Sequence, residues 1–405
     1  MSEVIETAPP IKGFKVASVH CGLKPAGDLD FVLIVSEAVC VGAGSFTTNP
    51  FVSESIRLNQ MRLESNPNSI RAVVIHTGCA NAFTGQTGKA NAAQVARWVA
   101  ERLGCEETAV LVLSSGEVGT QLPMVKLRCG VDLAFEALGD DWDAAAKAIR
   151  TTDKTAKIWW REIYGVQILG IKSAHVAVLV SDAAIRAEDL DDTLYWAVNG
   201  SFENYVTDDG TDETAVIMLC NGASNIQIQG DYRTNWGVFG LDVRLVCDEL
   251  AWLNTKDENG ATKIIEIEVR GAPGAWWDSV NNWTAAHKIA YTIASSMRVR
   301  TGLYNNVLNW GEVLAAAGRA GVPLSPEKLT LWLMPGYISE WPEGAVTLYL
   351  NGQPMLYDDE LVKSIVSSSR FNFVLYCGDR QGSDASFGTS DLSPEYITLN
   401  SSYRH

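Results

Sequence analysis

The feature that most constrains the fold of this chain is the alternation of strand-like and helix-like segments along its whole length. Short β-branched runs bounded by Gly, Asn or Asp recur throughout, as in "RAVVIHT" (71–77) and "TAVIMLC" (214–220). Between such runs, the spacing of apolar residues predicts helices over 92–104, 188–200 and 281–297. Because 405 residues are too many for one small core, this alternation predicts an α/β protein of two or three packed layers.

Two features indicate that the strands are covered on both faces. The stretch "ILGIKSAHVAVLVSDAA" (168–184) is apolar at successive positions and reads as one buried strand. The pairs Trp159–Trp160 and Trp276–Trp277 are adjacent bulky rings, which point to opposite faces when they lie on a strand. We therefore expect each tryptophan pair to join two packed layers.

Composition and charge exclude several classes of partner. The chain has 32 basic and 48 acidic side chains, and its formal charge of −16 repels nucleic acid and anionic membranes. We expect no secretory signal and no membrane span, since no apolar run reaches about 20 residues. The eight cysteines are scattered and never form C-x-x-C, which indicates reduced thiols. These observations predict a cytoplasmic protein without a metal or a cofactor.

The most linker-like point of the chain is "GAPGAWW" (271–277), which follows a strand and precedes a helix. It predicts a main α/β region over 1–270 that carries the core of the site. A smaller C-terminal α/β region then covers 271–405, and we expect its tail to return to the site.

Gly- and Thr-rich junctions follow one another in a recognisable order. The series consists of "GAGSFTTN" (42–49), "HTGCANAFTGQTG" (76–88), "SSGEVGTQLPM" (114–124), "IRTTDKTAK" (149–157), "DENGATKIIEIEVRGA" (257–272), "IASSMRVRTGLYNNVLNWGEVLAAAG" (293–318) and "SDLSPEYITLNSSYRH" (390–405). This series resembles the glutamate N-acetyltransferase (ornithine acetyltransferase) family of arginine biosynthesis over nearly the whole chain.

The resemblance implies both a fold and an activity. The fold is a layered sandwich of stacked β-sheets flanked by helices. The family's precursor cleaves itself ahead of a threonine, which then takes an acetyl group from N-acetylornithine and passes it to glutamate. A hydroxyl needs a nearby base to become a nucleophile, and an oxyanion hole must hold the charge that develops on the carbonyl oxygen.

Carried over position by position, the resemblance also names a site. It implies an oxyanion pair at Ser115 and Gly116, which a strand-to-turn "SSG" equally explains as plain structure. The substrate-binding positions that it implies are Thr151, Lys172, Asn259, Asn400 and His405. Lys172 has an equally acceptable interpretation as a solvated lysine at a strand edge.

The sequence departs from the family at the cleavage segment. The family's loop between the lysine and the following strand is missing from "GIKSAHVAVLVSDA" (170–183), and Ala174 stands where the nucleophilic threonine belongs. Asn259 replaces an acidic residue, and His405 replaces a threonine. We therefore expect an uncleaved chain whose pocket persists while the family's acyl-enzyme chemistry does not.

Three residues are candidates for replacing the lost chemistry. Ser173 is the nearest hydroxyl, although hydrogen bonding at a strand edge explains a serine equally well. Cys79 follows His76 by three residues and is either a thiolate nucleophile or a small buried hydrophobe. His175, next to Ala174, is either catalytic or a satisfied buried histidine. No ligand spacing supports a metal bound by His76, His175 and His405.

Three functions remain open at this point. The first is acyl or amide chemistry on an amino-acid-like small molecule with a reworked site. The second is a pseudoenzyme that binds or scaffolds without turnover, and the third is a genuine glutamate N-acetyltransferase whose nucleophile lies elsewhere. We also expect a homodimer or a higher homo-oligomer.

Overall fold

A computed structural model describes residues 7–25, 27–205, 213–230, 233–257, 260–274, 277–278, 283–336 and 344–402. These residues fall into two compact units, which divide between Phe202 and Glu203 and again between Asn254 and Thr255. The first unit takes the described residues of 1–202 and 208–254, and the second takes those of 203–207 and 255–403.

The strands of the first unit run in the order β4–β3–β2–β8–β7–β6–β5, with β1 paired to β2. Their bounds are β1 (Phe14–Val19), β2 (Phe31–Phe46), β3 (Ile70–Cys79), β4 (Val110–Glu117), β5 (Lys157–Ile163), β6 (Val166–Lys172), β7 (Val176–Ser181) and β8 (Ala215–Cys220). The first half of β2 pairs with β1 and β3, and its second half pairs with β8. Residues 37–39 between the halves are exposed, so β2 carries the chain from one half of the sheet to the other.

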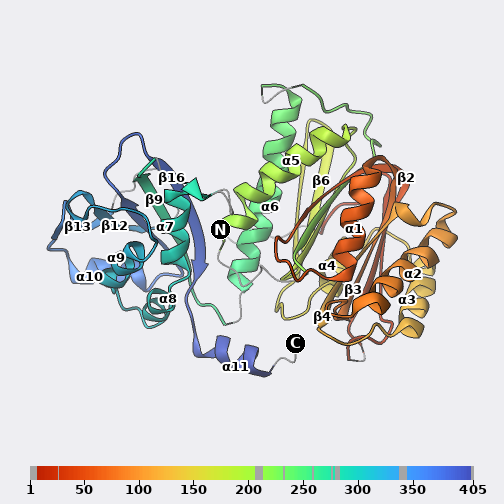
Figure 1. The fold of residues 1–405 in the computed structure, drawn as a ribbon, viewed down its shortest axis with the longest axis horizontal. Coiled ribbons are helices and arrows are strands. Elements are labelled where there is room, and N and C mark those ends of the chain that lie inside the picture. The colour runs from red at the N-terminus through yellow and green to blue at the C-terminus, as the bar shows by residue number, and fades with distance from the viewer. Residues whose placement is uncertain are drawn as a thin grey trace. The chain divides into compact units, whose positions relative to one another are not determined.

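Helices cover this sheet, which folds back on itself. Their bounds are α1 (Glu54–Ser65), η1 (Pro67–Ser69), α2 (Gly85–Leu103), η2 (Glu107–Ala109), α3 (Met124–Glu136), α4 (Trp142–Ala148), α5 (Ala187–Gly200), η3 (Phe202–Asn204) and α6 (Asn235–Asp257). Ile34 and Ile75 from one half share a buried cluster with Val178 and Ile217 from the other half. The outer face of the first half packs on α2 and α3, and that of the second half packs on α5 and α6 (Figure 1). The order of layers is helix, sheet, sheet, helix, which confirms the predicted layered α/β sandwich.

Two local predictions are confirmed in this unit. α2 ends at Gly104, whose φ of 63° is the left-handed conformation that glycine adopts without strain. In β5, Trp160 packs against the core between the sheet halves, while Trp159 packs on the side of α5 and α6. Trp159 and Trp160 therefore join two layers, as expected. In the other pair, Trp276 and the side chain of Trp277 lie outside the described residues.

The second unit is a separate α/β layer structure with its own core. Its sheet runs in the order β14–β13–β12–β15–β9–β16. The strands are β9 (Ile264–Ala272), β12 (Thr330–Pro335), β13 (Val346–Leu350), β14 (Gln353–Pro354), β15 (Arg370–Tyr376) and β16 (Ser383–Ser390), with the short pair β10 (Trp277–Asp278) and β11 (Trp283–Thr284) apart from them. The helical segments are α7 (Ala285–Ala294), α8 (Met297–Tyr304), α9 (Trp310–Gly318), η4 (Pro326–Lys328), α10 (Asp359–Val366) and α11 (Pro394–Ser402).

Strand β9 decides where the second unit begins. It pairs in parallel with β15 and antiparallel with β16, so it lies inside the second sheet. The sequence-based boundary at residue 270 had assigned this strand to the first region. The hydrogen-bonded partners of β9 follow it by about a hundred residues, and the linker-like composition of 271–277 carries no information about them.

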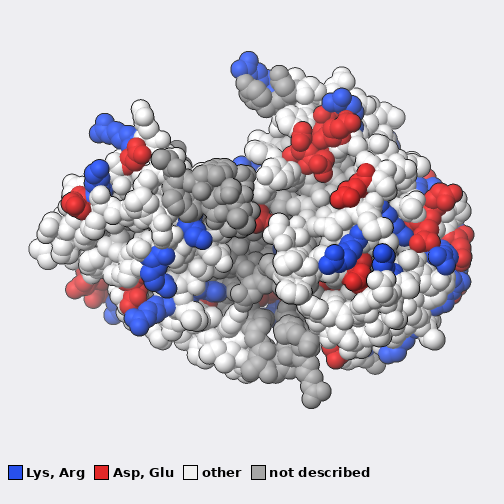
Figure 2. Space-filling model, in the orientation of Figure 1, with Lys and Arg blue, Asp and Glu red and all other residues white. Residues whose placement is uncertain are grey.

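Surface charge is uneven on the face shown in Figure 2. Acidic side chains gather over α5. The first turn of this helix carries Glu188 and Asp189, and Asp191 and Asp192 follow in the next turn. Elsewhere on this face, basic and acidic side chains of the described residues are interspersed. An acidic gathering of this kind repels phosphate backbones and other polyanions.

Candidate functional site

The stretch 168–184 forms a hairpin and not the single strand that its composition predicts. β6 ends at Lys172 and β7 begins at Val176, and the two strands pair antiparallel. The Ser173 amide donates a hydrogen bond to the Val176 carbonyl at 2.9 Å, which closes a connection of two residues, Ala174 and His175. Both strands are buried on both faces, so apolar residues run up to the turn on either side and conceal it in the sequence.

The turn residues differ in what they offer chemically. The Ser173 side chain is buried, and its hydroxyl lies 3.5 Å from the carbonyl oxygen and 3.4 Å from the amide nitrogen of Val176. Ala174 carries a methyl group with no atom that attacks a carbonyl. The His175 carbonyl accepts the Ala215 amide at 3.1 Å, which ties the turn to β8. The nucleophilic role predicted for Ser173 and the catalytic role predicted for His175 stay predictions.

Asp153 is the centre of a buried polar group beside this turn. Its carboxylate pairs with the Lys157 ammonium and accepts the amides of Thr151 at 3.1 Å and Ala174 at 3.3 Å. Burial alone would raise the pKa of Asp153, but the charge of Lys157 and these hydrogen bonds hold it below its usual value. Asp153 is therefore an ionised carboxylate that joins the segment after α4 to the β6–β7 turn.

Lys172 brings a second buried ammonium to the same place. It pairs with Lys157 in the β5–β6 register, so both side chains lie on one face of the sheet. Its Nζ donates to the carbonyls of Ser173 at 2.9 Å and Ala174 at 3.0 Å, and lies 5.2 Å from the centre of the Phe202 ring. We name Thr151, Asp153, Lys157, Lys172 and Ala174 the Asp153 cluster.

Ser115 and Gly116, the predicted oxyanion pair, end strand β4. They lie opposite Thr77 and Gly78 of β3 in a parallel register. Gly116 has a φ of 135°, and a Cβ built there would lie 2.5 Å from the Gly78 carbonyl carbon. Only glycine fits this close approach of two backbones. This approach packs the backbones of β3 and β4 closely against each other near the ends of both strands.

A chain of contacts connects this strand end to the Asp153 cluster. The Thr77 hydroxyl donates to the Ala148 carbonyl at 2.8 Å, and Ala148 is the last residue of α4, three positions before Thr151. Among the described residues, neither the Ser115 hydroxyl nor the Thr151 hydroxyl has a hydrogen-bond partner, and both oxygens are buried. These contacts place Ser115 beside Thr77, whose hydroxyl is bound to the helix end three residues before Thr151. The site roles predicted for Ser115 and Thr151 stay predictions.

His76 lies on the opposite face of β3 from Thr77. Successive strand residues point to opposite faces, and Phe31, which pairs with His76, belongs to the core under α2 and α3. Burial lowers the pKa of His76 to about 4, so the ring is neutral at pH 7. A hydrogen bond with the Cys79 backbone and the charge of Asp30 oppose this effect of burial without cancelling it.

Cys79 is a buried thiol at the end of β3. Burial, followed by the charges of Glu117 and Glu213, raises its pKa to about 11. Its Sγ donates to the Thr120 carbonyl at 3.7 Å. The protonated form of a thiol is a weak nucleophile, so this environment opposes the nucleophilic role predicted for Cys79, which stays a prediction.

Three predicted substrate-binding residues lie outside what the structure describes. Asn259 and His405 are outside the described residues, and the Asn400 side chain is likewise not described although α11 includes its backbone. Their roles, and the return of the tail to the site, stay predictions. Asp153 and Lys157 were missed in the quoted motif "IRTTDKTAK". Their spacing of four positions was the available signal for a charge pair.

The described residues also bear on metal binding and on membrane insertion. They contain no group of three or more His, Cys, Asp or Glu side chains that could hold a metal ion. The same residues include no helix that is both long and apolar enough to cross a membrane.

Comparison with known proteins gives a consistent set of relatives. The model of the ArgJ family matches residues 15–405. The arginine biosynthesis bifunctional protein ArgJ of Thermotoga neapolitana is 34% identical over 411 residues, which cover 97% of this chain and 99% of that protein. The mitochondrial ArgJ of Dictyostelium discoideum is 32% identical over 429 residues, which cover 100% of this chain and 95% of that protein.

Solved structures also match parts of the chain. The crystal structure of ArgJ from Bacillus halodurans has 22% sequence identity and a TM-score of 0.47, and the match covers 56% of this chain and 99% of that one. The ornithine acetyltransferase of Mycobacterium tuberculosis, solved with ornithine bound, has 30% identity and a TM-score of 0.34. That match covers 39% of this chain and 81% of that one.

Proposed function

Because this chain belongs to the ArgJ family, we propose that it acts as an uncleaved chain on an amino-acid-like small molecule by acyl or amide chemistry at the Asp153 cluster. The observation that carries the proposal is the pair of buried hydroxyls, Ser115 and Thr151, without hydrogen-bond partners in the described chain. A buried polar group left unpaired costs about 1–3 kcal/mol. A ligand that bonds to either hydroxyl would recover that free energy.

The charges of the Asp153 cluster suit an amino acid. The buried ammonium group of Lys172 and the buried carboxylate of Asp153 contact the turn that carries Ala174, and the second buried ammonium group, Lys157, pairs with Asp153. In an amino acid, the carboxylate is complementary in charge to the lysine ammonium groups, and the protonated amine is complementary to the Asp153 carboxylate. The solved relative that holds ornithine in its crystal supports the same class of ligand.

Acyl transfer at this site would proceed without a covalent enzyme intermediate. The acyl carbonyl would lie at Ser115 and Gly116, where backbone groups meet the developing oxyanion. The incoming amine nitrogen, or a water oxygen, would bond to the carbonyl carbon, and the bond to the first nitrogen would break. A proton would pass from the attacking atom to the leaving nitrogen. The two-residue turn and Ala174 support an uncleaved chain, because residue 174 has no hydroxyl to attack the preceding carbonyl.

A second candidate function is binding without turnover. It is favoured by the environments of the two replacement nucleophiles: the Ser173 hydroxyl bonds within its own turn, and the pKa of Cys79 is raised to about 11. The genuine glutamate N-acetyltransferase is the third candidate, and it requires a nucleophile that Ala174 does not provide.

Three measurements together separate the three candidates. They are denaturing intact-mass spectrometry before and after incubation with N-acetyl-L-ornithine, calorimetric titration with the same ligand, and an assay for released ornithine. A single unmodified chain of 44.0 kDa with turnover supports the proposal. Binding without turnover supports the second function, and two fragments or an acetylated chain support the third. The variants Ser115→Ala and Thr151→Val should each weaken binding about tenfold. Failure of the wild type to bind ornithine, N-acetylornithine or glutamate would overturn the proposal.

A further inference from the structure

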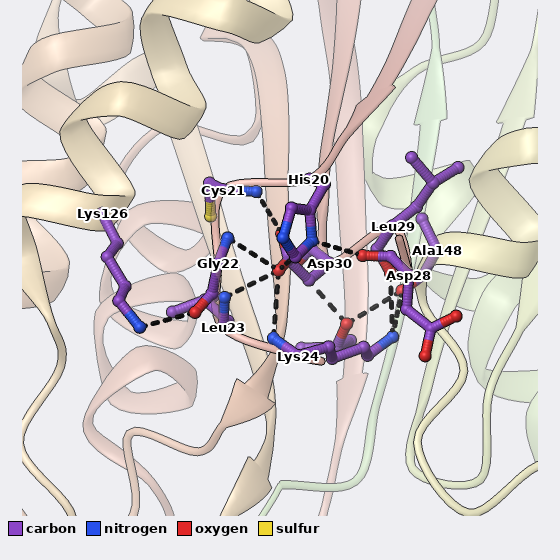
Figure 3. Close-up of polar contacts among 11 residues, drawn as sticks. His20, Cys21, Gly22, Leu23, Lys24, Asp28, Leu29, Asp30, Lys126 and Ala148 are labelled. Atoms are coloured by element: carbon purple, nitrogen blue, oxygen red, sulfur yellow. Dashed lines mark hydrogen bonds and ion pairs between the residues drawn. The ribbon is translucent and has the colours of Figure 1, made fainter. Parts of the chain in front are cut away.

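An anionic side chain away from the Asp153 cluster organises the N-terminal loop of the first unit. The fully buried carboxylate of Asp30, the residue immediately before β2, accepts four successive backbone amides (Figure 3). The Cys21 amide donates to Oδ1 at 2.7 Å, and Oδ2 accepts Gly22 at 3.0 Å, Leu23 at 2.7 Å and Lys24 at 3.0 Å. A run of amides around one anion fixes the loop backbone closely.

The charge of Asp30 is maintained by these bonds. Burial alone would raise its pKa, but the amides of residues 21–24 lower the pKa below its usual value. His20 adds a further contact, since its Nδ1 lies 3.2 Å from Asp30 Oδ2 and 2.6 Å from the Asp28 carbonyl oxygen. Asp30 is therefore an ionised anchor whose bonds set the position of every residue in the loop.

Lys24, the last of the four residues whose amides bind Asp30, reaches toward the functional site. Lys24 Nζ donates to the Leu29 carbonyl at 3.1 Å and to the Ala148 carbonyl at 2.7 Å. Ala148 ends α4, where a cation meets the negative end of the helix dipole. The same carbonyl accepts the Thr77 hydroxyl at 2.8 Å, so one oxygen receives donors from the N-terminal loop and from β3.

The segment that follows Ala148 carries Thr151 and Asp153. The segment is held near its start, where the Arg150 amide reaches the Lys147 carbonyl at 3.4 Å, and again at Asp153, whose carboxylate accepts the amides of Thr151 at 3.1 Å and Ala174 at 3.3 Å. The contacts at Ala148 set where the segment begins, and those at Asp153 set where it meets the β6–β7 turn. A displacement of about 1 Å at a site can cost about a hundredfold in function.

We propose that Asp30 and Lys24 are positioning residues, which hold the segment between α4 and β5 in the geometry that the Asp153 cluster needs. The hydrogen bonds to Asp30 fix the backbone of residues 21–24. Lys24 in turn binds the Ala148 carbonyl, from which the segment 149–157 continues. The effect on ligand affinity rests on the proposed function, whereas the effect on the segment itself does not. Burial and the nearby guanidinium of Arg150, opposed by Asp30, lower the pKa of Lys24 to about 8, so positioning should weaken as pH rises through that value.

The test uses Lys24→Met, Lys24→Arg and Asp30→Asn in the full chain, with Lys126→Met as the matched control. Lys126 donates to the Gly22 carbonyl of the same loop at 2.6 Å, in the view of Figure 3, but has no bond to Ala148. Hydrogen exchange of the ligand-free protein is followed by mass spectrometry on peptides covering 149–157. We expect Lys24→Met and Asp30→Asn to speed exchange there about tenfold, Lys24→Arg to restore most of the protection, and Lys126→Met to change nothing.

Two results would overturn the inference. One is a hydrogen-exchange rate over 149–157 in Lys24→Met that equals the rate in the wild type. The other is faster exchange spread evenly over the whole first unit, since that pattern indicates general destabilisation. If Asp30→Asn does not fold, the comparison of Lys24→Met with Lys24→Arg still decides, because both keep Asp30. Titration with N-acetyl-L-ornithine should show about tenfold weaker binding in Lys24→Met. If the wild type binds no ligand, the proposed function fails, while the exchange comparison still decides the positioning role.

Discussion

At the residue scale, the pairing of Asp153 with Lys157 is a buried ion pair whose loss we expect to be costly. Both side chains are nearly inaccessible, at 2% and 1% exposure. Asp153→Asn leaves the Lys157 charge buried without its partner, so the free energy of unfolding in urea at pH 7 should fall by about 3–5 kcal/mol. Asp140→Asn breaks the exposed pair with Lys15 and should cost about 0–1 kcal/mol. Equal losses in the two variants would refute this view of Asp153.

His76 gives a pH dependence whose sign follows from its lowered pKa. The unfolded chain binds a proton near pH 6.5, whereas the folded His76 does so only near about pH 4. Stability is therefore complete above pH 6.5 and falls by about 3 kcal/mol as the pH drops from 6.5 to 4. In His76→Leu this component should be missing. The measurement is urea unfolding of both proteins at several pH values. Curves that stay parallel below pH 6 would contradict the prediction.

Some properties of the site residues could be predicted from the sequence and others could not, depending on whether tertiary contacts determine them. Ser115 and Thr151 were named as site residues because their motifs resemble those of a known family, and their roles stay predictions. The face on which His76 lies could not, because it depends on pairing with Phe31 and on the contact of Thr77 with Ala148. Burial of Asp153 is likewise supplied by strands distant in the chain, so its neighbours in sequence do not indicate it.

At the element scale, the β6–β7 turn should block self-cleavage even when the hydroxyl is restored. Ala174→Thr places a hydroxyl next in sequence to the Ser173 carbonyl, but the bond from the Ser173 amide to the Val176 carbonyl closes the turn and restrains the backbone on both sides of residue 174. We expect intact-mass spectrometry to show one uncleaved chain. Ala174→Val, which has the same branching without the hydroxyl, is the control. Two fragments from Ala174→Thr alone would show that a missing hydroxyl was the only obstacle.

Helices were easier to predict than the connections between strands. α2, α5 and α7 follow from apolar spacing, because one face of each is buried and the other is not. The β6–β7 turn was missed since Ala174 and His175 are neither Gly, Pro nor Asn and the strands on both sides are fully buried. The sequence of β2 also does not indicate that its first half pairs with β3 and its second half with β8, because those strands lie elsewhere in the chain.

At the scale of the whole molecule, the hydrophobic clusters do not mix residues of the two units. The cluster under the second sheet draws its buried members from Ile265 to Phe387, while the three clusters of the first unit draw theirs from Ala8 to Leu250. Each unit thus buries an apolar core built from its own strands and helices. Such an arrangement predicts that the two units unfold separately and not as one cooperative body.

A pair of matched cavity variants tests that independence. Leu333 and Leu179 are both fully buried leucines on strands, one in each unit. Truncation of either to alanine should cost about 2–5 kcal/mol. If the cores are independent, Leu333→Ala will speed hydrogen exchange in β9, β12 and β15 while β3 and β7 keep wild-type protection, and Leu179→Ala will do the reverse. Should either variant speed exchange equally in both units, the chain unfolds as a single body, because loss of one core would then remove the protection of the other.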